Sequence, residues 1–407
     1  AGFGSVRDEA YWAAQEPVPG TIEWTPEVVN YTDALADENI DLYMVLSYGN
    51  PNWDDNVAPT SPEGIEAFAD YAVAAVGRFG TDRVYDVWNE WNWGFGDGPA
   101  GRKAETYLAL LKATYTKVKA AYPDAKLVGP VSAGVPADWL HEFFEGGGLD
   151  YIDGLSIHPY TWPVGPEVLE KSLQDTRAIM AEYGEPKPMY VSEIGWPTGT
   201  DVRAVDDVTQ ARYLAQAQAI SLSNDVERFV VYNFMEKGTD DADTEHRFGI
   251  VHNRADIRGA YTPKPSYASL ATSNRLLAGK ASTGKTTIGP VTDYAFAADG
   301  SSSTHVLWST EPTTVSIAAT GTVTVTDLYG ASTTLEPSSS GEVSVSIGSD
   351  PVYVEGAVSA VEADATHSLT VSDSDVGEEI RGTWSIDNTT GTDPITAELR
   401  IGDETWT

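Results

Sequence analysis

Short apolar runs alternate with amphipathic stretches along the first 279 residues of the chain. The apolar runs predict strands at 3–7, 41–47, 84–88, 126–131, 152–158, 188–193 and 228–234. Between them, apolar residues recur at three- and four-residue spacing, which predicts helices. Among these helices are 63–79, 104–121, 167–183 and 209–223. Nearly continuous apolar strands that alternate with helices are typical of a parallel sheet covered by helices.

This pattern predicts an α/β fold, a (β/α)8 TIM barrel, for residues 1–279. A closed barrel needs eight strands, and the apolar runs supply seven. The first run carries Arg7, with Trp12 shortly after it, and these have the character of site residues at the end of a second strand. We therefore expect a first β/α unit to precede Ala1. A doubly wound open sheet is the alternative.

The pattern changes after about residue 280. Helical periodicity stops, and Thr, Ser, Val and Gly dominate, with apolar and polar residues alternating at 313–317 and 322–325. Alternation with frequent turns predicts a β-sandwich. We expect an accessory β-sandwich domain at 280–357 and a further, partial β module at 358–407.

Two carboxylates lie at the ends of two predicted barrel strands. Glu90 stands within WNEWN at 88–92, and Glu193 ends the strand at 188–193. In a (β/α)8 barrel, the carboxyl ends of the strands meet on one face, where the active site is built. Two facing carboxyl groups are what cleavage of a glycosidic bond with retention requires. We expect Glu90 and Glu193 to lie roughly 5 Å apart in a common site.

Four further polar residues are candidates for the same site. A nucleophilic carboxylate must stay ionised, so it needs nearby positive charge and hydrogen-bond donors. Arg7 is the candidate for the charge beside Glu193, and the phenol of Tyr160 is a candidate donor. His158, also at a strand end, is expected to contact the acid or a sugar hydroxyl, and Asn89 to bind a sugar hydroxyl.

Aromatic side chains are numerous, with 12 Trp and 20 Tyr in the chain. Their flat apolar faces suit stacking on sugar rings. The tryptophans that follow strand runs, and are therefore expected to line the site, are Trp12, Trp53, Trp162 and Trp196. The last barrel loop adds the weaker candidates Tyr232, Asn233 and Glu236.

Composition narrows the classes of function. With 61 Asp and Glu against 25 Lys and Arg, the net charge is −36, which disfavours nucleic acid and is compatible with a neutral polysaccharide. No apolar run is long enough for a membrane span. Cysteine is absent, no zinc-type histidine spacing or phosphate-binding glycine loop occurs, and we expect neither metal nor cofactor. The acidic balance indicates a soluble secreted protein, or alternatively adaptation to high salt.

Several motifs together resemble the retaining glycoside hydrolases of clan A. WNEWN at 88–92 resembles the acid/base motif after the fourth strand, and YVSEIGW at 190–196 resembles the nucleophile strand, the seventh. SVRDE at 5–9, with Trp12 and Glu16, resembles the second-strand segment of family 39 and its relatives. RFGI at 247–250 and KPSY at 264–267 resemble the segment before the last helix there. Trp91 departs from the proline usual in family 39.

The resemblance implies a retaining glycoside hydrolase that acts on an oligo- or polysaccharide, endo action being slightly favoured. Glu90 would be the acid/base and Glu193 the nucleophile. The expected partner is the carbohydrate substrate, without nucleic acid or membrane, and the enzyme is expected to be a secreted monomer. The alternatives are a transglycosylase on the same scaffold, a non-catalytic carbohydrate-binding protein, and a structural surface protein carried by the β modules.

Overall fold

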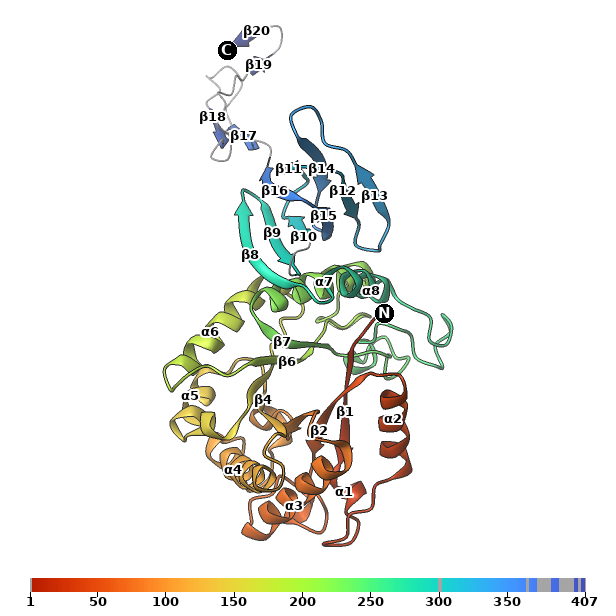
Figure 1. Ribbon diagram of the computed structural model, residues 1–407, viewed down its shortest axis with the longest axis vertical. Coiled ribbons are helices and arrows are strands. Elements are labelled where there is room, and N and C mark those ends of the chain that lie inside the picture. The colour runs from red at the N-terminus through yellow and green to blue at the C-terminus, as the bar shows by residue number, and fades with distance from the viewer. Residues whose placement is uncertain are drawn as a thin grey trace. The chain divides into compact units, whose positions relative to one another are not determined.

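The parallel strands between residues 5 and 231 are surrounded by helices in the computed structural model (Figure 1). The structure describes residues 2–298, 302–363, 366–371, 382–387, 399–401 and 404–406. The chain divides into two compact units, Ala1–Arg275 and Leu276–Thr407. Among the described residues, no helix is both long and apolar enough to cross a membrane.

The first unit contains one sheet of seven parallel strands in the sequential order β1 to β7. Sequential order is the winding of a (β/α) barrel, whereas a doubly wound sheet reverses its order at a switch point. The observed order therefore contradicts the doubly wound alternative. The strands are β1 (Ser5–Tyr11), β2 (Asp41–Ser47), β3 (Val84–Val87), β4 (Lys126–Ala133), β5 (Gly154–His158), β6 (Met189–Ile194) and β7 (Val226–Val231).

The sheet curls around its own interior. Residues from five strands form one apolar cluster, with Tyr43, Val84, Val128 and Tyr190 buried and Val230 packed against them. Arg228 on β7 also forms an ion pair with Asp41 on β2, with Nη2 and Oδ2 3.0 Å apart. A TIM-like arrangement of the parallel sheet is thus present, and the closed eight-stranded barrel stays a prediction.

Amphipathic helices follow the strands, as the residue spacing predicts. The N-terminus of helix α3 is stabilised by two residues. Pro62 has no amide hydrogen that would need an acceptor, and the Ser61 hydroxyl accepts a hydrogen bond from the Gly64 amide at 3.0 Å. The helices are α1 (Trp12–Gln15), α2 (Pro26–Asp37), α3 (Pro62–Phe79), α4 (Ala104–Ala121), α5 (Ala137–Glu145), α6 (Leu169–Ala181), α7 (Asp207–Ser223) and α8 (Pro265–Leu277). Shorter turns of helix lie at Asp54–Asn56, Trp91–Phe95, Gly148–Tyr151, Pro166–Val168 and Thr244–His246.

The second unit is built from antiparallel strands. A six-stranded sheet has the order β13-β12-β15-β10-β9-β8, and a three-stranded sheet the order β14-β11-β16. Both sheets contribute to one buried cluster, which includes Leu307 and Val354 from the first and Ile317 and Val345 from the second. Two antiparallel sheets over a shared core are the coarse form of the predicted β-sandwich.

The strands of this unit begin close to the predicted boundary at residue 280. They are β8 (Ala281–Ile288), β9 (Val291–Ala297), β10 (Ser303–Ser309), β11 (Thr313–Ala319), β12 (Val323–Thr326), β13 (Ser332–Leu335), β14 (Glu342–Ile347), β15 (Val352–Gly356) and β16 (Val358–Ala363). The second predicted boundary, between residues 357 and 358, falls directly before β16, which pairs with β11.

The structure describes only short strands beyond residue 365. These are β17 (Thr366–Val371), β18 (Gly382–Asp387), β19 (Leu399–Ile401) and β20 (Glu404–Trp406). They pair as two separate antiparallel hairpins, β17 with β18 and β19 with β20. The remainder of the module predicted at 358–407 lies outside the described residues.

Candidate active site

The turn after β3 holds Glu90 in an unusual backbone conformation. Trp88 and Glu90 both have positive φ, at 71° and 45°, and such conformations cost about 1–3 kcal/mol each for residues other than glycine. Neighbouring strands hold the turn, because the Trp88 amide donates to the Leu46 carbonyl at 3.0 Å and the Glu90 amide to the Val131 carbonyl at 2.8 Å. The carboxylate of Glu90 is thereby fixed at the ends of the strands.

Glu193 on β6 is surrounded by donors. The Arg7 guanidinium donates to its Oε1 at 2.5 Å, and the Tyr160 hydroxyl donates to its Oε2 at 2.9 Å. Burial alone raises the pKa of a carboxyl group, but the charges of His158 and Arg7 and the Tyr160 hydrogen bond outweigh it, so the pKa of Glu193 is lowered. Burial and the Glu193 charge raise the pKa of Tyr160 well above its usual value, so this phenol stays a donor.

Arg7 is held by three acceptors, two from β3 and the turn after it and one from β6. Besides Glu193, its Nε donates to Asp86 at 2.7 Å and its Nη2 to the side-chain carbonyl of Asn89 at 2.9 Å. Asp86 also accepts from the Tyr43 hydroxyl at 2.9 Å. The guanidinium is therefore fixed in position, and Asn89 serves as its partner in this structure.

His158 at the end of β5 connects the two carboxylates. Its Nδ1 lies 2.7 Å from Glu90 Oε1 and 3.7 Å from Glu193 Oε2. The ring is buried, whereas both carboxylates keep some exposure to solvent. One atom from each of the three residues lies within 4.8 Å of the other two. The two carboxyl groups predicted to face one another thus lie in one site.

The tryptophans expected to line the site lie in different surroundings. Trp12 is fully buried and packs edge-on against Phe68 of α3, and Trp196 is fully buried and donates to the Val164 carbonyl at 2.8 Å. Trp162 lies beside Tyr160, with ring centroids 6.2 Å apart. Trp53 is partly buried and forms a bridge with Asn50. The structure therefore brings Trp162 near the carboxylate pair, and it places Trp12 and Trp196 in the protein interior.

Some residues around the pair are absent from the sequence-based candidates. Asp86 is fully buried inside the four-residue strand β3. A buried charge needs a partner, so an aspartate within an apolar run could have been recognised from the sequence as a candidate. Tyr48 follows β2. Burial raises the pKa of its phenol, and the charges of Glu9 and Glu193 raise it further. Glu9 lies on β1 two residues beyond Arg7 and so shares its face of the sheet. Glu9 belongs to the SVRDE motif at 5–9 but was not selected as a site residue, and Tyr48 lies outside the motifs.

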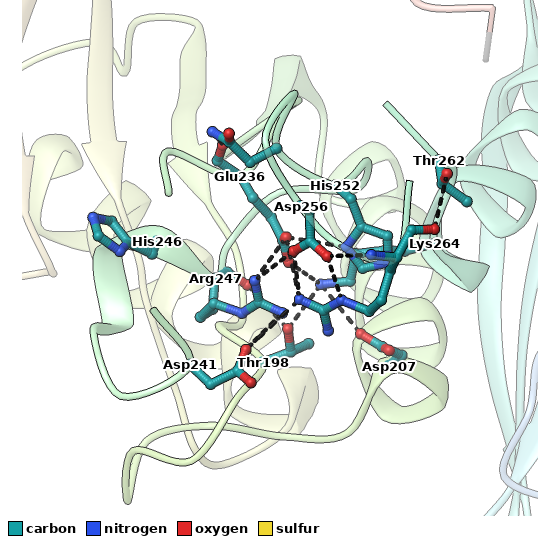
Figure 2. A network of polar contacts seen from close by, with 12 residues as sticks. Thr198, Asp207, Glu236, Asp241, His246, Arg247, His252, Asp256, Thr262 and Lys264 are labelled. Atoms are coloured by element: carbon teal, nitrogen blue, oxygen red, sulfur yellow. Dashed lines mark hydrogen bonds and ion pairs between the residues drawn. The ribbon is translucent and has the colours of Figure 1, made fainter. Parts of the chain in front are cut away.

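A second polar network ties together the segment between β7 and α8 (Figure 2). Its centre is the buried carboxylate of Glu236, which receives Arg247 at 2.8 Å, His252 at 3.0 Å and Lys264 at 3.3 Å. Lys264 also donates to Thr198 at 2.8 Å. Burial lowers the pKa of Lys264, although its acidic neighbours partly offset this. Glu236, a weaker candidate for the site, is thus the centre of this network.

The network is connected to the candidate site through the backbone. Arg247 is followed by Phe248, whose ring lies 6.0 Å from that of Tyr160 and 5.2 Å from that of Tyr232. Tyr232 in turn donates its hydroxyl to Glu245 at 2.8 Å. Phe248 therefore links the segment of the network to Tyr160 by packing, and the Tyr160 hydroxyl contacts Glu193.

Two groups of side chains have the spacing to hold a metal ion among the described residues. They are Glu90, His158 and Glu193, and Glu236, His252 and Asp256. In both, cationic side chains already pair with the carboxylates, Arg7 with Glu193, and Arg247 and Lys264 with Glu236. Both groups are therefore suited to ion pairing. The group of Glu90, His158 and Glu193 is also suited to proton transfer and to nucleophilic attack by a carboxylate.

Comparison with known proteins finds relatives by structure. No protein-family model and no curated protein matches the chain. A family 39 glycoside hydrolase from the gut symbiont Bacteroides cellulosilyticus WH2 is similar, with 25% identity and a TM-score of 0.73 over 87% of this chain and 76% of that one. A monomeric β-xylosidase from Caulobacter crescentus CB15 is 16% identical, with a TM-score of 0.57 over 85% and 86% of the two chains. An endo-β-1,6-glucanase is 14% identical, with a TM-score of 0.61 over 88% and 83%. The last two show a shared fold.

Proposed function

The chain resembles the family 39 glycoside hydrolases of clan A, and from this premise we propose that it is a retaining enzyme. It cleaves O-glycosidic bonds of an oligo- or polysaccharide by double displacement. The observation that carries the proposal is the site in which atoms of Glu90, His158 and Glu193 lie within 4.8 Å of one another. Retaining enzymes place their two carboxyl groups about 5–5.5 Å apart, close enough for direct attack on a bound ring.

The two carboxylates take different roles. Glu193, whose pKa is lowered, attacks the anomeric carbon as a carboxylate, while the protonated carboxyl of Glu90 gives its proton to the departing oxygen. A covalent glycosyl ester on Glu193 results. Glu90, now a carboxylate, takes a proton from water, and the oxygen of that water attacks the anomeric carbon and releases Glu193. The enzyme returns to its starting state without any cofactor.

The surroundings of each carboxylate support these roles. Arg7 and Tyr160 place positive charge and a hydrogen-bond donor against Glu193, which favours its ionised form. His158 contacts Glu90 at 2.7 Å, so a proton can be shared between the imidazole and the acid. Asn89 holds Arg7 in place in this structure, and this fixes the guanidinium that faces the nucleophile.

The substrate we propose is a neutral glycan cleaved internally. The net charge of −36 and the acidic site disfavour anionic polymers. Relatives named as a β-xylosidase and an endo-β-1,6-glucanase share the fold, and the aromatic side chains around this site favour a chain of sugars over a single one. We further propose that the enzyme is secreted and acts as a monomer.

Product stereochemistry tests the proposal. Plant, algal and microbial glycans are screened for hydrolysis, and the anomer released first is recorded by proton NMR before mutarotation. We expect the configuration of the cleaved bond to be kept in the product. Inversion of configuration would contradict the double displacement, and sugar binding without hydrolysis would indicate a non-catalytic protein. Transfer to an added acceptor sugar in preference to water would identify a transglycosylase.

Removing the Tyr160 hydroxyl tests how Glu193 is kept ionised. In Tyr160→Phe, Glu193 loses a hydrogen bond that favours its charged form, so its pKa rises. The acid limb of the pH profile of kcat/KM is then expected to move to higher pH. At the pH optimum, we expect kcat/KM to fall about 10- to 100-fold, the loss of a hydrogen bond to a charged group.

A second tyrosine serves as the control for this variant. Tyr115 on α4 donates its hydroxyl to Asp153 at 3.2 Å, so Tyr115→Phe also removes one phenolic hydrogen bond. Its pH profile is expected to match that of the unmodified enzyme. An acid limb that stays unmoved in Tyr160→Phe would show that this phenol does not control the ionisation of Glu193.

A further inference from the structure

The loop that carries Glu90 displays two aromatic side chains to solvent although its backbone is firmly held. Trp93 is 65% exposed and Phe95 is 45% exposed. Within the same loop, the Asn92 side chain bonds both the amide and the carbonyl of Ala133, each at 2.9 Å. Trp88 donates to the Phe95 carbonyl at 2.9 Å, and Trp91 is fully buried. The exposed rings are therefore presented by a fixed frame.

Phe95, one of the two exposed rings, continues into a row of aromatic rings at the strand ends. Phe95 stacks on Tyr48, with centroids 5.2 Å apart and planes at 24°. Tyr48 lies 6.1 Å from Tyr11, which is 51% exposed. Burial raises the pKa of both phenols, and the nearby carboxylate of Glu9 raises it further. Trp93, Phe95, Tyr48 and Tyr11 together are here called the aromatic rim.

Exposure of this kind needs a physical reason. A large aromatic side chain buries about 150–250 Å² when it is covered, so leaving several of them in water is unfavourable. Contiguous exposed apolar surface on a folded protein commonly marks a place where something binds. The rim includes the loop of Glu90, because the Trp93 amide donates to the Glu90 carbonyl at 3.0 Å.

We propose that the aromatic rim binds the leaving-group part of a neutral sugar chain, so that the enzyme cleaves bonds followed by further sugar residues. This inference rests on the proposed function. Glu90 gives its proton to the departing oxygen, so rings on its own loop flank the side from which the leaving group departs. The flat apolar faces of the rim suit the C–H faces of sugar rings.

The charges near the rim select the kind of chain. The charge of Glu9 acts on both tyrosines of the rim, and the charge of Glu193 acts on Tyr48, so carboxylates are concentrated here. Arg7 is the cation at the carboxylate pair, and it is already bound by Asp86, Asn89 and Glu193. A sugar with its own carboxylate would be repelled, whereas hydroxyl groups are good donors to Glu9.

The test compares two leaving groups attached to the same sugar. In the glycosyl fluorides of β-xylose, β-glucose and β-galactose, the leaving group is a fluoride ion, which makes no contact with the rim. In xylan, β-glucan and β-galactan, the leaving group is a sugar chain. In Trp93→Ala, kcat/KM on the hydrolysed polysaccharide is expected to fall about 10- to 100-fold. On the matching fluoride, the change is expected to stay within about twofold. Trp93→Phe keeps a flat ring and is expected to restore most of the activity on the polysaccharide.

Tyr329→Ala is the control, because Tyr329 is a 42% exposed aromatic residue in the second unit. It is expected to leave both activities unchanged. Equal losses on the fluoride and the polysaccharide in Trp93→Ala, or no loss on either, would overturn the role of the rim. Wild-type hydrolysis of fluorides without any polysaccharide would overturn it too. If Glu193→Gln keeps wild-type turnover on both substrates, the proposed function itself fails.

Discussion

Replacing Glu193 by glutamine is expected to lower kcat/KM by about 10⁴-fold, a loss of about 5.4 kcal/mol of transition-state stabilisation. An amide has no negative charge and cannot form the glycosyl ester, so the first displacement is blocked. The side-chain carbonyl of glutamine can still accept from Arg7, which also keeps its bond to Asp86. Hydrolysis of the best glycan found in the screen measures the effect.

The fold must be shown to survive this change. Circular dichroism and thermal unfolding of Glu193→Gln are compared with those of the unmodified protein. Glu227→Gln is the matched control, because Glu227 is an exposed glutamate on the neighbouring strand β7. It is expected to keep full activity. A folded Glu193→Gln protein with wild-type turnover would rule out Glu193 as the nucleophile.

Glu90→Ala is expected to separate substrates by their leaving group. On a sugar chain, which needs a proton to depart, we expect kcat to fall about 10²- to 10⁴-fold. Fluoride departs without a proton, so the glycosyl ester on Glu193 should still form from a glycosyl fluoride. Its hydrolysis needs a base that the variant lacks, so the ester is expected to accumulate and KM to fall.

Azide gives a direct check of this assignment. It attacks without losing a proton, so it should release the ester in Glu90→Ala and yield a glycosyl azide of retained configuration. The same addition to the unmodified enzyme should have little effect. Loss of activity in Glu90→Ala that is equal for fluoride and sugar leaving groups, and that azide does not relieve, would assign the acid/base role to another residue.

The sequence predicted the first unit because strands and helices there have strong local signals. Buried parallel strands such as β2 and β6 are nearly continuous apolar runs. The start of α3 is indicated by Ser61 and Pro62, which are typical of a helix N-terminus. The curl of the sheet follows from repeated strand–helix units. The pairing in the second unit was less accessible, because β12 pairs with β15 and β11 with β16 across long stretches of chain. Alternation along one strand does not say which strand lies beside it.

For the candidate site, the sequence predicted which residues lie at strand ends, but it did not predict the direction in which their side chains point. Glu90, Glu193, His158 and Tyr160 follow or end strands, and the structure brings them together. Trp12 has the same position in sequence, but α1 begins there and its ring turns toward α3 and into the core. The direction of such a side chain depends on a few backbone dihedral angles between the strand and the loop. These angles produce no periodic pattern in the sequence.

The Glu236 network allows part of this face to vary in length through evolution. Glu236 and Arg247 join the base of the loop between them by an ion pair at 2.8 Å, and the outermost part of that loop, residues 239–243, is exposed. The free energy of closing a loop grows slowly with its length, so residues inserted beside Asp241 would cost little as long as its contacts with Arg247 and Thr200 are kept. Tyr232 and Phe248 would keep their places beneath such an insertion. An insertion in this loop would therefore change the outer surface of this face while the carboxylate pair stays unchanged.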